Sequence, residues 1–386
     1  MSEHPRNHEV AWWHHEITPI RESLSHDRET DVCVVGLGGS GIAAVRAARE
    51  MGASVIGIDG DRIAGAAAGR NGGLLLGGMA PFHHDAAAQW GATPAAALYT
   101  HTLAELGRMQ RDSPADTWWN GSLRIAESDE EREDCVRQQE QMERDGLPVS
   151  WYVGPEGEGL FFPHDGACHP VRRVHALAAR AEREGAVLHE QSRVRAVHQG
   201  RVELVNGVVV HAPVIVVCAD GALGELLPDA ALLLRPVRLQ MLATEPAYDV
   251  RLPRPVYARY GYDYWQQLPD HRIVFGGGRD QFVDDEFTAD DTPSDAVQSW
   301  LDQRLRQCVE TSAAITHRWA ATVSYTPDEL PIAREFADGV WGVGGYCGTG
   351  NVVGALCGRG TVRRAMGASD VFLDVLDAIR AERAAP

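Results

Sequence analysis

The stretch DVCVVGLGGSGIAAVRAAREMGASVIGID, residues 31–59 of the 386-residue chain, decides the fold. Apolar residues at 32–35 predict a short buried strand, which stops where a helical pattern begins. Four glycines follow, three of them spaced as G-x-G-x-x-G: Gly36, Gly38, Gly39 and Gly41. This spacing lets the chain turn sharply and lets a pyrophosphate approach the backbone at a helix N-terminus. A second strand at 54–58 completes a unit that predicts dinucleotide binding.

The second predicted strand ends at Asp59, which is followed by Gly60. Asp59 lies about 20 residues after the glycine turn, the usual place of a carboxylate that accepts hydrogen bonds from an adenosine ribose. A phosphate on the ribose 2′ position would be repelled there, which favours FAD or NAD over NADP. The alternative interpretation is that the glycines only tighten a strand-to-helix turn.

Composition excludes several classes of function. The net charge of −18 argues against nucleic acid and anionic membranes as partners. No apolar run is long enough for a membrane span, and the N-terminus lacks the pattern of a secretion signal. Seven cysteines without a C-x-x-C pair predict reduced thiols and a cytoplasmic protein. Adjacent histidine pairs do not complete a ligand set, so no metal site is predicted.

All 36 basic residues are arginine, because the sequence contains no lysine. A Schiff-base lysine and a P-loop lysine are therefore excluded. Chemistry must come from a cofactor or from His, Tyr, Asp, Glu or Cys side chains.

Several further segments carry clear patterns. The segment 61–78 is rich in glycine and alanine and suits close approach of the backbone to a flat ligand, although a flexible linker is the alternative. Residues 127–145 predict a charged helix with a solvated face. A helix is predicted at 170–185, and the Asn206-Gly207 pair predicts a hairpin. From residue 236 alternating strands dominate, with an amphipathic helix at 294–310.

One of these strands is rich in tyrosine. A period of two places Tyr260, Tyr262, Tyr264 and Gln266 on one face of it. The face is either ordinary sheet packing or the wall of a substrate pocket. Near the C-terminus, Gly350, Gly354 and Gly358 recur every four residues, which predicts a helix packed closely on another element. Its N-terminus would offer free N–H groups to negative charge, those of Gly348, Thr349 and Gly350.

Taken in order, these motifs resemble the FAD-dependent amine and amino-acid oxidoreductases of the D-amino-acid oxidase, glycine oxidase and sarcosine oxidase type. The resemblance covers nearly the whole chain and includes AGRNGG at 68–73, VIVVCADG at 214–221, FGGG at 275–278, YTPDELP at 325–331 and GGYCGTG at 344–350. AGRNGG is most similar to the γ-glutamylputrescine oxidase branch.

The resemblance implies an α/β (α+β) fold, with a Rossmann-like FAD-binding domain and a second, antiparallel-sheet substrate domain. We expect the FAD domain to comprise 1–85, 150–235 and 320–386, and the substrate domain 86–149 and 236–319. The positions that the resemblance places at FAD, besides the glycine turn and Asp59, are Arg70, Asn71, Gly72, Gly73, Val194, Ala219, Asp220, Gly221, Gly345, Cys347, Gly348, Thr349 and Gly350.

The sequence departs from these relatives at three points. Val323 stands where glycine oxidase-like relatives carry an arginine for the substrate carboxylate. Ala321 stands where sarcosine oxidase-like relatives attach the flavin to cysteine, so non-covalent FAD is expected, although Cys347 replaces the usual serine of the flavin segment. No lysine is present to activate oxygen.

The favoured hypothesis is oxidation of a C–N bond of a small amine or amino-acid derivative, with O2 or another acceptor taking the electrons. Tyr262 and Tyr264 would desolvate the amine, and His83 would accept its proton, unless that histidine is only structural. Two alternatives remain: an FAD-dependent hydroxy-acid dehydrogenase, and a flavin-bearing electron-transfer subunit of a larger assembly.

Overall fold

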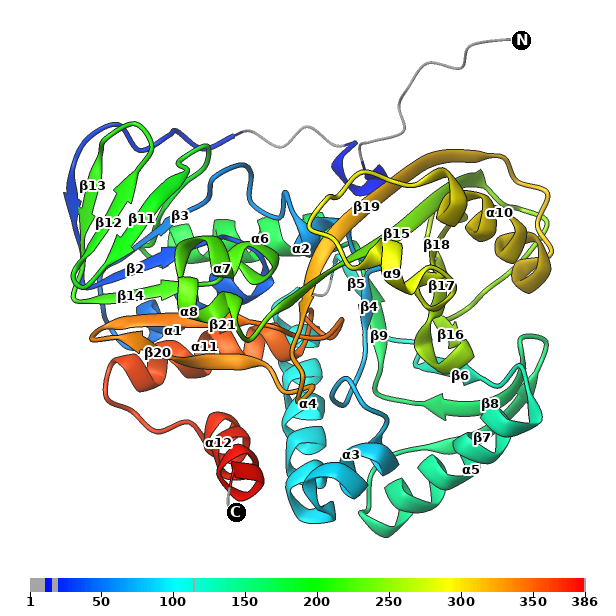
Figure 1. Cartoon of the computed structure of the whole chain (residues 1–386). Helices are drawn as coiled ribbons and strands as arrows, with labels where there is room; N and C mark the ends of the chain where they lie inside the picture. Colours follow the sequence, from blue (N-terminus) through cyan, green and yellow to red (C-terminus); the bar gives the residue numbers. More distant parts are fainter. Residues whose placement is uncertain (1–10, 16–19, 114, 385–386) are drawn as a thin grey trace, which may run out of the picture.

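Two large sheets dominate the computed structural model, which describes residues 11–15, 20–113 and 115–384 (Figure 1). The first sheet has six strands and lies on the left in Figure 1. All neighbours are parallel except the last pair. In spatial order its strands are β10 (Val187–His189), β3 (Val55–Ile58), β2 (Val32–Val35), β14 (Val214–Val217), β21 (Val340–Gly344) and β20 (Ile332–Ala337).

Helices cover one face of the six-stranded sheet. Strand β2 is buried throughout, and the chain turns at Gly36, whose φ of +91° suits glycine. The covering helices are α1 (Gly39–Glu50), α4 (Ala92–Asp112), α6 (Pro170–Arg183), α11 (Val353–Ala365) and α12 (Val371–Ala384). Helix α11 packs directly on α1, since a Cβ at Gly358 would lie 2.1 Å from the carbonyl oxygen of Ser40. The predicted close packing of the glycine-rich helix is confirmed.

A four-stranded sheet covers the opposite face. The predicted Asn206-Gly207 hairpin joins two of its strands, and Gly207 has the positive φ (+87°) that such a turn requires. The strands, in spatial order, are β1 (Arg28–Glu29), β13 (Val209–His211), β12 (Arg201–Leu204) and β11 (Val194–His198). The six-stranded sheet is therefore buried on both sides.

The second large sheet has eight strands and lies on the right in Figure 1. Helix α10 (Asp295–Val309) packs on it with an apolar face, and Ser294 caps this helix by accepting from the Val297 N–H. The strands, in spatial order, are β19 (Ile315–Tyr325), β15 (Arg235–Pro246), β18 (Arg272–Gly277), β17 (Asp263–Gln267), β16 (Val256–Ala258), β6 (Ser122–Ile125), β8 (Gly157–Phe162) and β7 (Ser150–Gly154).

Strands β7 and β8 bear on the division into domains. They lie within the range 150–235 that was assigned to the FAD domain, yet they pair with each other and with β6 in the eight-stranded sheet. The pairing therefore places 150–162 with the second sheet. Helix α4 lies within the range 86–149 that was assigned to the substrate domain, yet it packs in the core of the first sheet. Strand β19 continues past residue 320 to Tyr325 and pairs with β15 of the second sheet throughout.

Helix α5 (Asp129–Arg144) differs from the prediction of a simply solvated, charged helix. Its inner face carries buried polar side chains that surround Arg124, which is fully buried. The guanidinium of Arg124 donates to Asp134 and to Gln138, both at 2.5 Å. The negative charge of Asp134 on this face is thus neutralised by Arg124, which lies on strand β6.

The smaller elements complete the fold. Strands β4 (Leu74–Leu75), β9 (Gly166–Cys168) and β5 (Thr117–Trp118) form a three-stranded sheet. The short helices are η1 (Trp12–His14), α2 (Ala67–Arg70), α3 (His83–Trp90), η2 (Asp220–Ala222), α7 (Leu223–Leu226), α8 (Pro228–Ala231), η3 (Arg259–Gly261), η4 (Arg279–Gln281) and α9 (Val283–Glu286). Among the described residues, no helix is both long and apolar enough to cross a bilayer.

Candidate functional site

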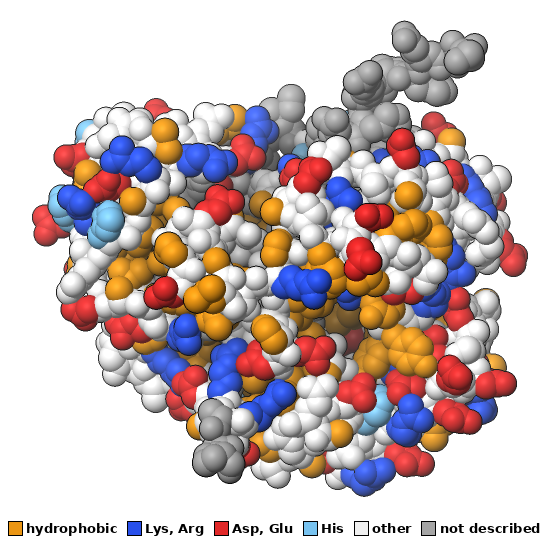
Figure 2. Space-filling model, viewed as in Figure 1, with side chains coloured by type: hydrophobic (Ala, Val, Ile, Leu, Met, Phe, Trp, Pro, Cys, Tyr) orange, Lys and Arg blue, Asp and Glu red, His pale blue; other side chains and the backbone are white. Residues whose placement is uncertain are grey.

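A single cavity of about 890 Å³ joins the two large sheets. It is lined by the glycine turn after β2, by the ends of β3 and β14, and by strands of the eight-stranded sheet. In Figure 2, hydrophobic side chains gather around a hollow in the middle of the face shown, below α9. The volume lies in the upper part of the range of small-molecule and cofactor sites.

The glycine turn is shaped by close packing. A Cβ at Gly36 would lie 2.5 Å from the carbonyl oxygen of Cys218, and one at Gly41 would lie 1.8 Å from the carbonyl oxygen of Gly36. At Gly39, in contrast, no atom of the described residues lies within 4 Å of such a Cβ. Gly36, Gly38 and Gly39 line the cavity at the start of α1, where the N–H groups of the first turn favour an anion. Gly41 does not line it, because it faces Gly36.

Asp59 lies at the end of β3 and lines the same part of the cavity as Gly60 and Val194. One carboxylate oxygen accepts from the Leu37 N–H at 2.7 Å, and the other from the Asp61 N–H at 2.9 Å. Burial raises the pKa of this carboxyl group. Each oxygen retains a second lone pair, so the carboxylate can still accept a ribose hydroxyl.

Three consecutive carbonyl groups of the 70–72 segment are held by side chains from distant parts of the chain. The Trp319 indole donates to the carbonyl of Arg70 at 2.7 Å, and the Trp13 indole donates to that of Asn71 at 2.9 Å. The amide of Gln266 donates to the carbonyl of Gly72 at 2.5 Å. The segment is therefore rigidly placed along the cavity.

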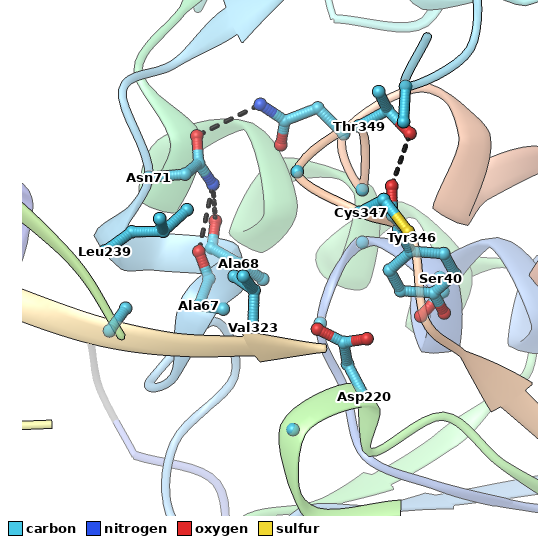
Figure 3. A pocket seen from close by; sticks show the side chains of 18 of the residues that line it. Ser40, Ala67, Ala68, Asn71, Asp220, Leu239, Val323, Tyr346, Cys347 and Thr349 are labelled. Carbon is cyan, nitrogen blue, oxygen red and sulfur yellow. Dashed lines mark hydrogen bonds between the residues drawn. The ribbon is translucent and has the colours of Figure 1, made fainter. Parts of the chain in front are cut away.

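The Asn71 side chain closes the same segment (Figure 3). Its Nδ2 donates to the carbonyls of Ala67 and Ala68 at 3.1 and 2.9 Å, and its Oδ1 accepts from Asn351 at 3.0 Å. Asn71 thus links the loop to the start of the last glycine-rich segment. Gly73 does not line the cavity, because its Cα faces a backbone carbonyl of β9.

Arg70 lines the cavity but is engaged elsewhere, since its guanidinium donates to Asp291 at 2.6 Å. Its Nε donates to the carbonyl of Gly65 at 3.0 Å, so Arg70 and Asn71 both support the loop.

Asp220 joins three segments beneath the cavity. Its carboxylate accepts from the Gly345 N–H at 2.8 Å and from the Ser324 N–H at 3.3 Å, and Figure 3 shows it beside the end of β19. Burial raises its pKa to about 6. Asp220 lines the cavity together with Ala219 and Gly221, whereas Gly345 lies behind it against Thr326.

The C-terminal glycine segment differs in one detail from the prediction. Helix α11 begins only at Val353, and the N–H of Thr349 donates to the carbonyl of Tyr346 at 2.9 Å in a preceding turn. The Thr349 N–H is therefore not free for a ligand, because the turn uses it. Cys347, Gly348, Thr349 and Gly350 nevertheless line the cavity, and burial raises the pKa of the Cys347 thiol to about 11.

The predicted tyrosine strand is only partly present. Tyr260 belongs to η3, where it has a φ of +58°, and the strand begins at Asp263. Tertiary contacts enforce this turn, because the Tyr260 N–H donates to a buried Glu131 carboxylate at 2.7 Å. The prediction of one continuous face is wrong, yet Tyr260, Tyr262 and Tyr264 all line the cavity.

His83 lines the cavity from the start of α3 and is buried. Its Nε2 lies 2.6 Å from a carboxylate oxygen of Asp145, so this nitrogen carries the hydrogen and Nδ1 is the basic one. Desolvation lowers the pKa of His83, which keeps the ring neutral near pH 7.

The far end of the cavity is an aromatic chamber that the sequence analysis missed. The Tyr257 ring stacks at 6.5 Å from Phe82 and at 6.2 Å from Phe162, and Gln138 of α5 lies at the same end. These residues come from three elements and from the residue that precedes α3, so no local pattern could have grouped them. Arg279, directly after FGGG, was missed as well.

Apolar side chains of β15 and β19 line the middle of the cavity. Leu239 lies opposite Ala321 in the pairing of the two strands, and Val323 follows along β19 (Figure 3). Ala321 offers no nucleophile for a covalent link to a cofactor, and Val323 offers no charge to a substrate.

Comparison with known proteins identifies the family. The model of the family described as "FAD dependent oxidoreductase" matches residues 31–364. The chain belongs to this family. FAD is therefore its cofactor. Three features of the cavity fit FAD: the uncrowded backbone at Gly39, the carboxylate of Asp59, and the 70–72 segment whose carbonyl groups are held by side chains. Ala321 lines the cavity and has no group that could form a covalent bond to FAD.

Individual relatives are distant from this FAD-dependent oxidoreductase. The probable oxidoreductase OrdL of Rhizobium meliloti (strain 1021) is 27% identical over 226 residues, which cover 56% of this chain and 50% of that protein. The chain thus spans about half the length of this relative. The probable oxidoreductase OrdL of Haemophilus influenzae is 22% identical over 92% of this chain and 87% of that protein.

Solved structures share the fold. A glycine oxidase from Geobacillus kaustophilus has a TM-score of 0.73 at 19% identity, and the match covers 89% of this chain and 96% of the glycine oxidase chain. An L-proline dehydrogenase from P. horikoshii has a TM-score of 0.75 at 19% identity, with 92% and 99% covered. An L-amino acid deaminase from Proteus vulgaris has a TM-score of 0.72 at 15% identity, with 92% and 97% covered.

Proposed function

We propose that this protein oxidises a C–N bond of a small amine or amino-acid derivative, and that O2 or another acceptor then takes the electrons. When bound, FAD supplies a two-electron acceptor for the hydride that leaves the carbon next to nitrogen. The resulting imine adds water and releases a carbonyl compound and ammonia or an amine. The seven free thiols suit a reducing cytoplasm, where we place the protein.

One observation carries the proposal: the cavity that starts at the glycine turn continues without interruption into the aromatic chamber. A cofactor bound along the first part would leave the second for a small substrate. The names of the three structural neighbours, an oxidase, a dehydrogenase and a deaminase of amino acids, support the same class of substrate.

The aromatic wall has a definite role in this scheme. Tyr262 and Tyr264 line the cavity where the amine would lie, and removing water from an ammonium group lowers its pKa. The amine must lose its proton before it can be oxidised. His83, neutral and with Nδ1 free of the Asp145 contact, accepts that proton.

The test uses the FAD-loaded protein without oxygen. Primary amines, secondary amines, amino acids and hydroxy acids are added in turn, and loss of the visible flavin absorbance is followed. We expect bleaching by at least one amine or amino acid and none by hydroxy acids. Bleaching by hydroxy acids alone would refute the proposal.

Variants of Tyr264 test the wall in the same assay. Tyr264→Phe keeps the apolar ring and is expected to retain most of the reduction rate, whereas Tyr264→Ala is expected to slow it at least about tenfold. Tyr248→Ala serves as the matched control, because Tyr248 is 77% exposed and does not line the cavity. Equal rates in all three variants would remove Tyr264 from the site.

A further inference from the structure

Arg279 brings a positive charge to the aromatic end of the cavity. It is the first residue of η4, directly after the left-handed Gly278 that ends β18. Its guanidinium carbon lies 5.0 Å from the centre of the Tyr262 ring and 4.9 Å from that of Tyr325. All three side chains line the cavity. The two rings hold the guanidinium by cation–π contacts, and none of the described residues accepts a hydrogen bond from its N–H groups.

No carboxylate within the described part of the chain lies within 4.0 Å of the Arg279 guanidinium. The acid next to it in sequence, Asp280, is bound by Arg259 and by Gln281. The chain has 54 acidic residues against 36 basic ones. A shortage of acidic residues therefore does not explain why Arg279 has no carboxylate partner among the described residues. A half-buried arginine without a counter-ion is unfavourable unless an anion joins it.

The other arginines that line the cavity do not share these properties. Arg70 is paired with Asp291, as described above. Arg193 is exposed and lies beside Gly60, at the end of the cavity marked by Asp59. Arg279 is therefore the available cation at the end where a substrate would lie.

We propose that Arg279 binds a carboxylate of the substrate, with its guanidinium held beside the rings of Tyr262 and Tyr325. The inference rests on the proposed function, in that the ligand of this end of the cavity is the substrate. The substrate class is then an amine that also carries a carboxylate. A polyamine without an anionic group is disfavoured, because its ammonium groups would meet the guanidinium.

The chemistry of the surroundings explains why such a site would be selective. Leu239, Ala321 and Val323, which line the middle of the same cavity from β15 and β19, are apolar and cannot compensate a carboxylate. A charged hydrogen bond in such surroundings is stronger than one in water. Discrimination between a carboxylate and its neutral amide should therefore depend on Arg279.

The test compares benzoate with benzamide, which have nearly the same shape but differ in charge. Binding of each to the FAD-loaded protein is measured by calorimetry, which requires no turnover. We expect benzoate to bind about 10- to 100-fold more tightly than benzamide, and Arg279→Gln to abolish this preference. Arg279→Lys, which keeps the charge but not the planar fork, should retain part of it.

Arg235→Gln is the matched control. Arg235 also stacks on an aromatic ring, at 3.2 Å from the centre of Phe287, but it does not line the cavity. This variant should keep the full preference for benzoate. Equal affinities of the wild-type protein for the two probes, failure of both to bind, or an unchanged preference in Arg279→Gln would overturn the inference.

These outcomes are separable from a failure of the proposed function. If no amine bleaches the flavin but Arg279→Gln still abolishes the benzoate preference, the anion site stands and the reaction class is wrong. If amines without a carboxylate bleach the flavin as fast as amino acids do, the reaction class stands and the anion site is refuted.

Discussion

Replacing Gly358 by alanine tests the packing that places the two helices at the cofactor end of the cavity. The new Cβ would lie 2.1 Å from the carbonyl oxygen of Ser40, whereas ordinary contact begins at 3.4 Å. The neighbour is backbone, so α1 and α11 must separate by roughly 1 Å, and overpacking of this kind costs about 1–3 kcal/mol. Ser40 lies in the first turn of α1, so FAD binding should weaken with the same substitution.

Gly107→Ala is the matched control, because Gly107 also lies inside a helix, α4, but a Cβ there meets only the end of Arg111 at 3.5 Å. Both variants gain up to about 1 kcal/mol of helix propensity. The difference between them therefore isolates the helix contact and should be about 1–3 kcal/mol in the free energy of unfolding.

The assay is thermal melting of the FAD-loaded protein, followed by the rise in flavin fluorescence as FAD is released. For a chain of 386 residues, Gly358→Ala should melt about 1–4 °C below Gly107→Ala. Equal melting temperatures, with equal FAD affinity, would refute the argument from helix packing.

Three further outcomes are expected. Asp59→Asn should raise the FAD dissociation constant about 10- to 100-fold in a fluorescence titration, because a charged acceptor is lost. Arg124→Met should destabilise the protein by about 3–5 kcal/mol in urea unfolding by leaving the buried Asp134 without this partner, whereas Arg137→Met, at a pair whose arginine is 56% exposed, should cost under about 1 kcal/mol. Burial raises the pKa of Asp165 to about 7, above its unfolded value of about 3.9, so the unfolded state releases this proton first. The free energy of unfolding should therefore fall from about pH 4 to about pH 7, and Asp165→Asn should flatten that fall in melts over this range.

The cofactor end of the site could be predicted because its signals are contiguous in the sequence. Residues 32–59 form one strand, turn, helix and strand unit, and Asp59 lies at its end in the structure as expected. Val194 and the 219–221 segment were placed by resemblance alone, and both line the cavity. Local spacing does not reveal them, because they come from separate crossings of the sheet.

The substrate end was predicted less well because long-range contacts decide it. Tyr260 leaves the period-two pattern because of Glu131, which lies 129 positions away in the sequence. The chamber around Tyr257 joins elements that approach one another only in the folded chain. Arg279 carried a local signal, its place directly after a glycine run that ends a strand, but its lack of a counter-ion is visible only in three dimensions.

The indole of Trp13 has a practical consequence for anyone who prepares this protein. It holds the carbonyl of Asn71, 58 positions further along the chain, beside the pocket for the coenzyme. A shortened version that starts after residue 13 would lack this contact, although it would keep every strand of both large sheets. Such a truncation should be isolated with a sub-stoichiometric amount of yellow chromophore.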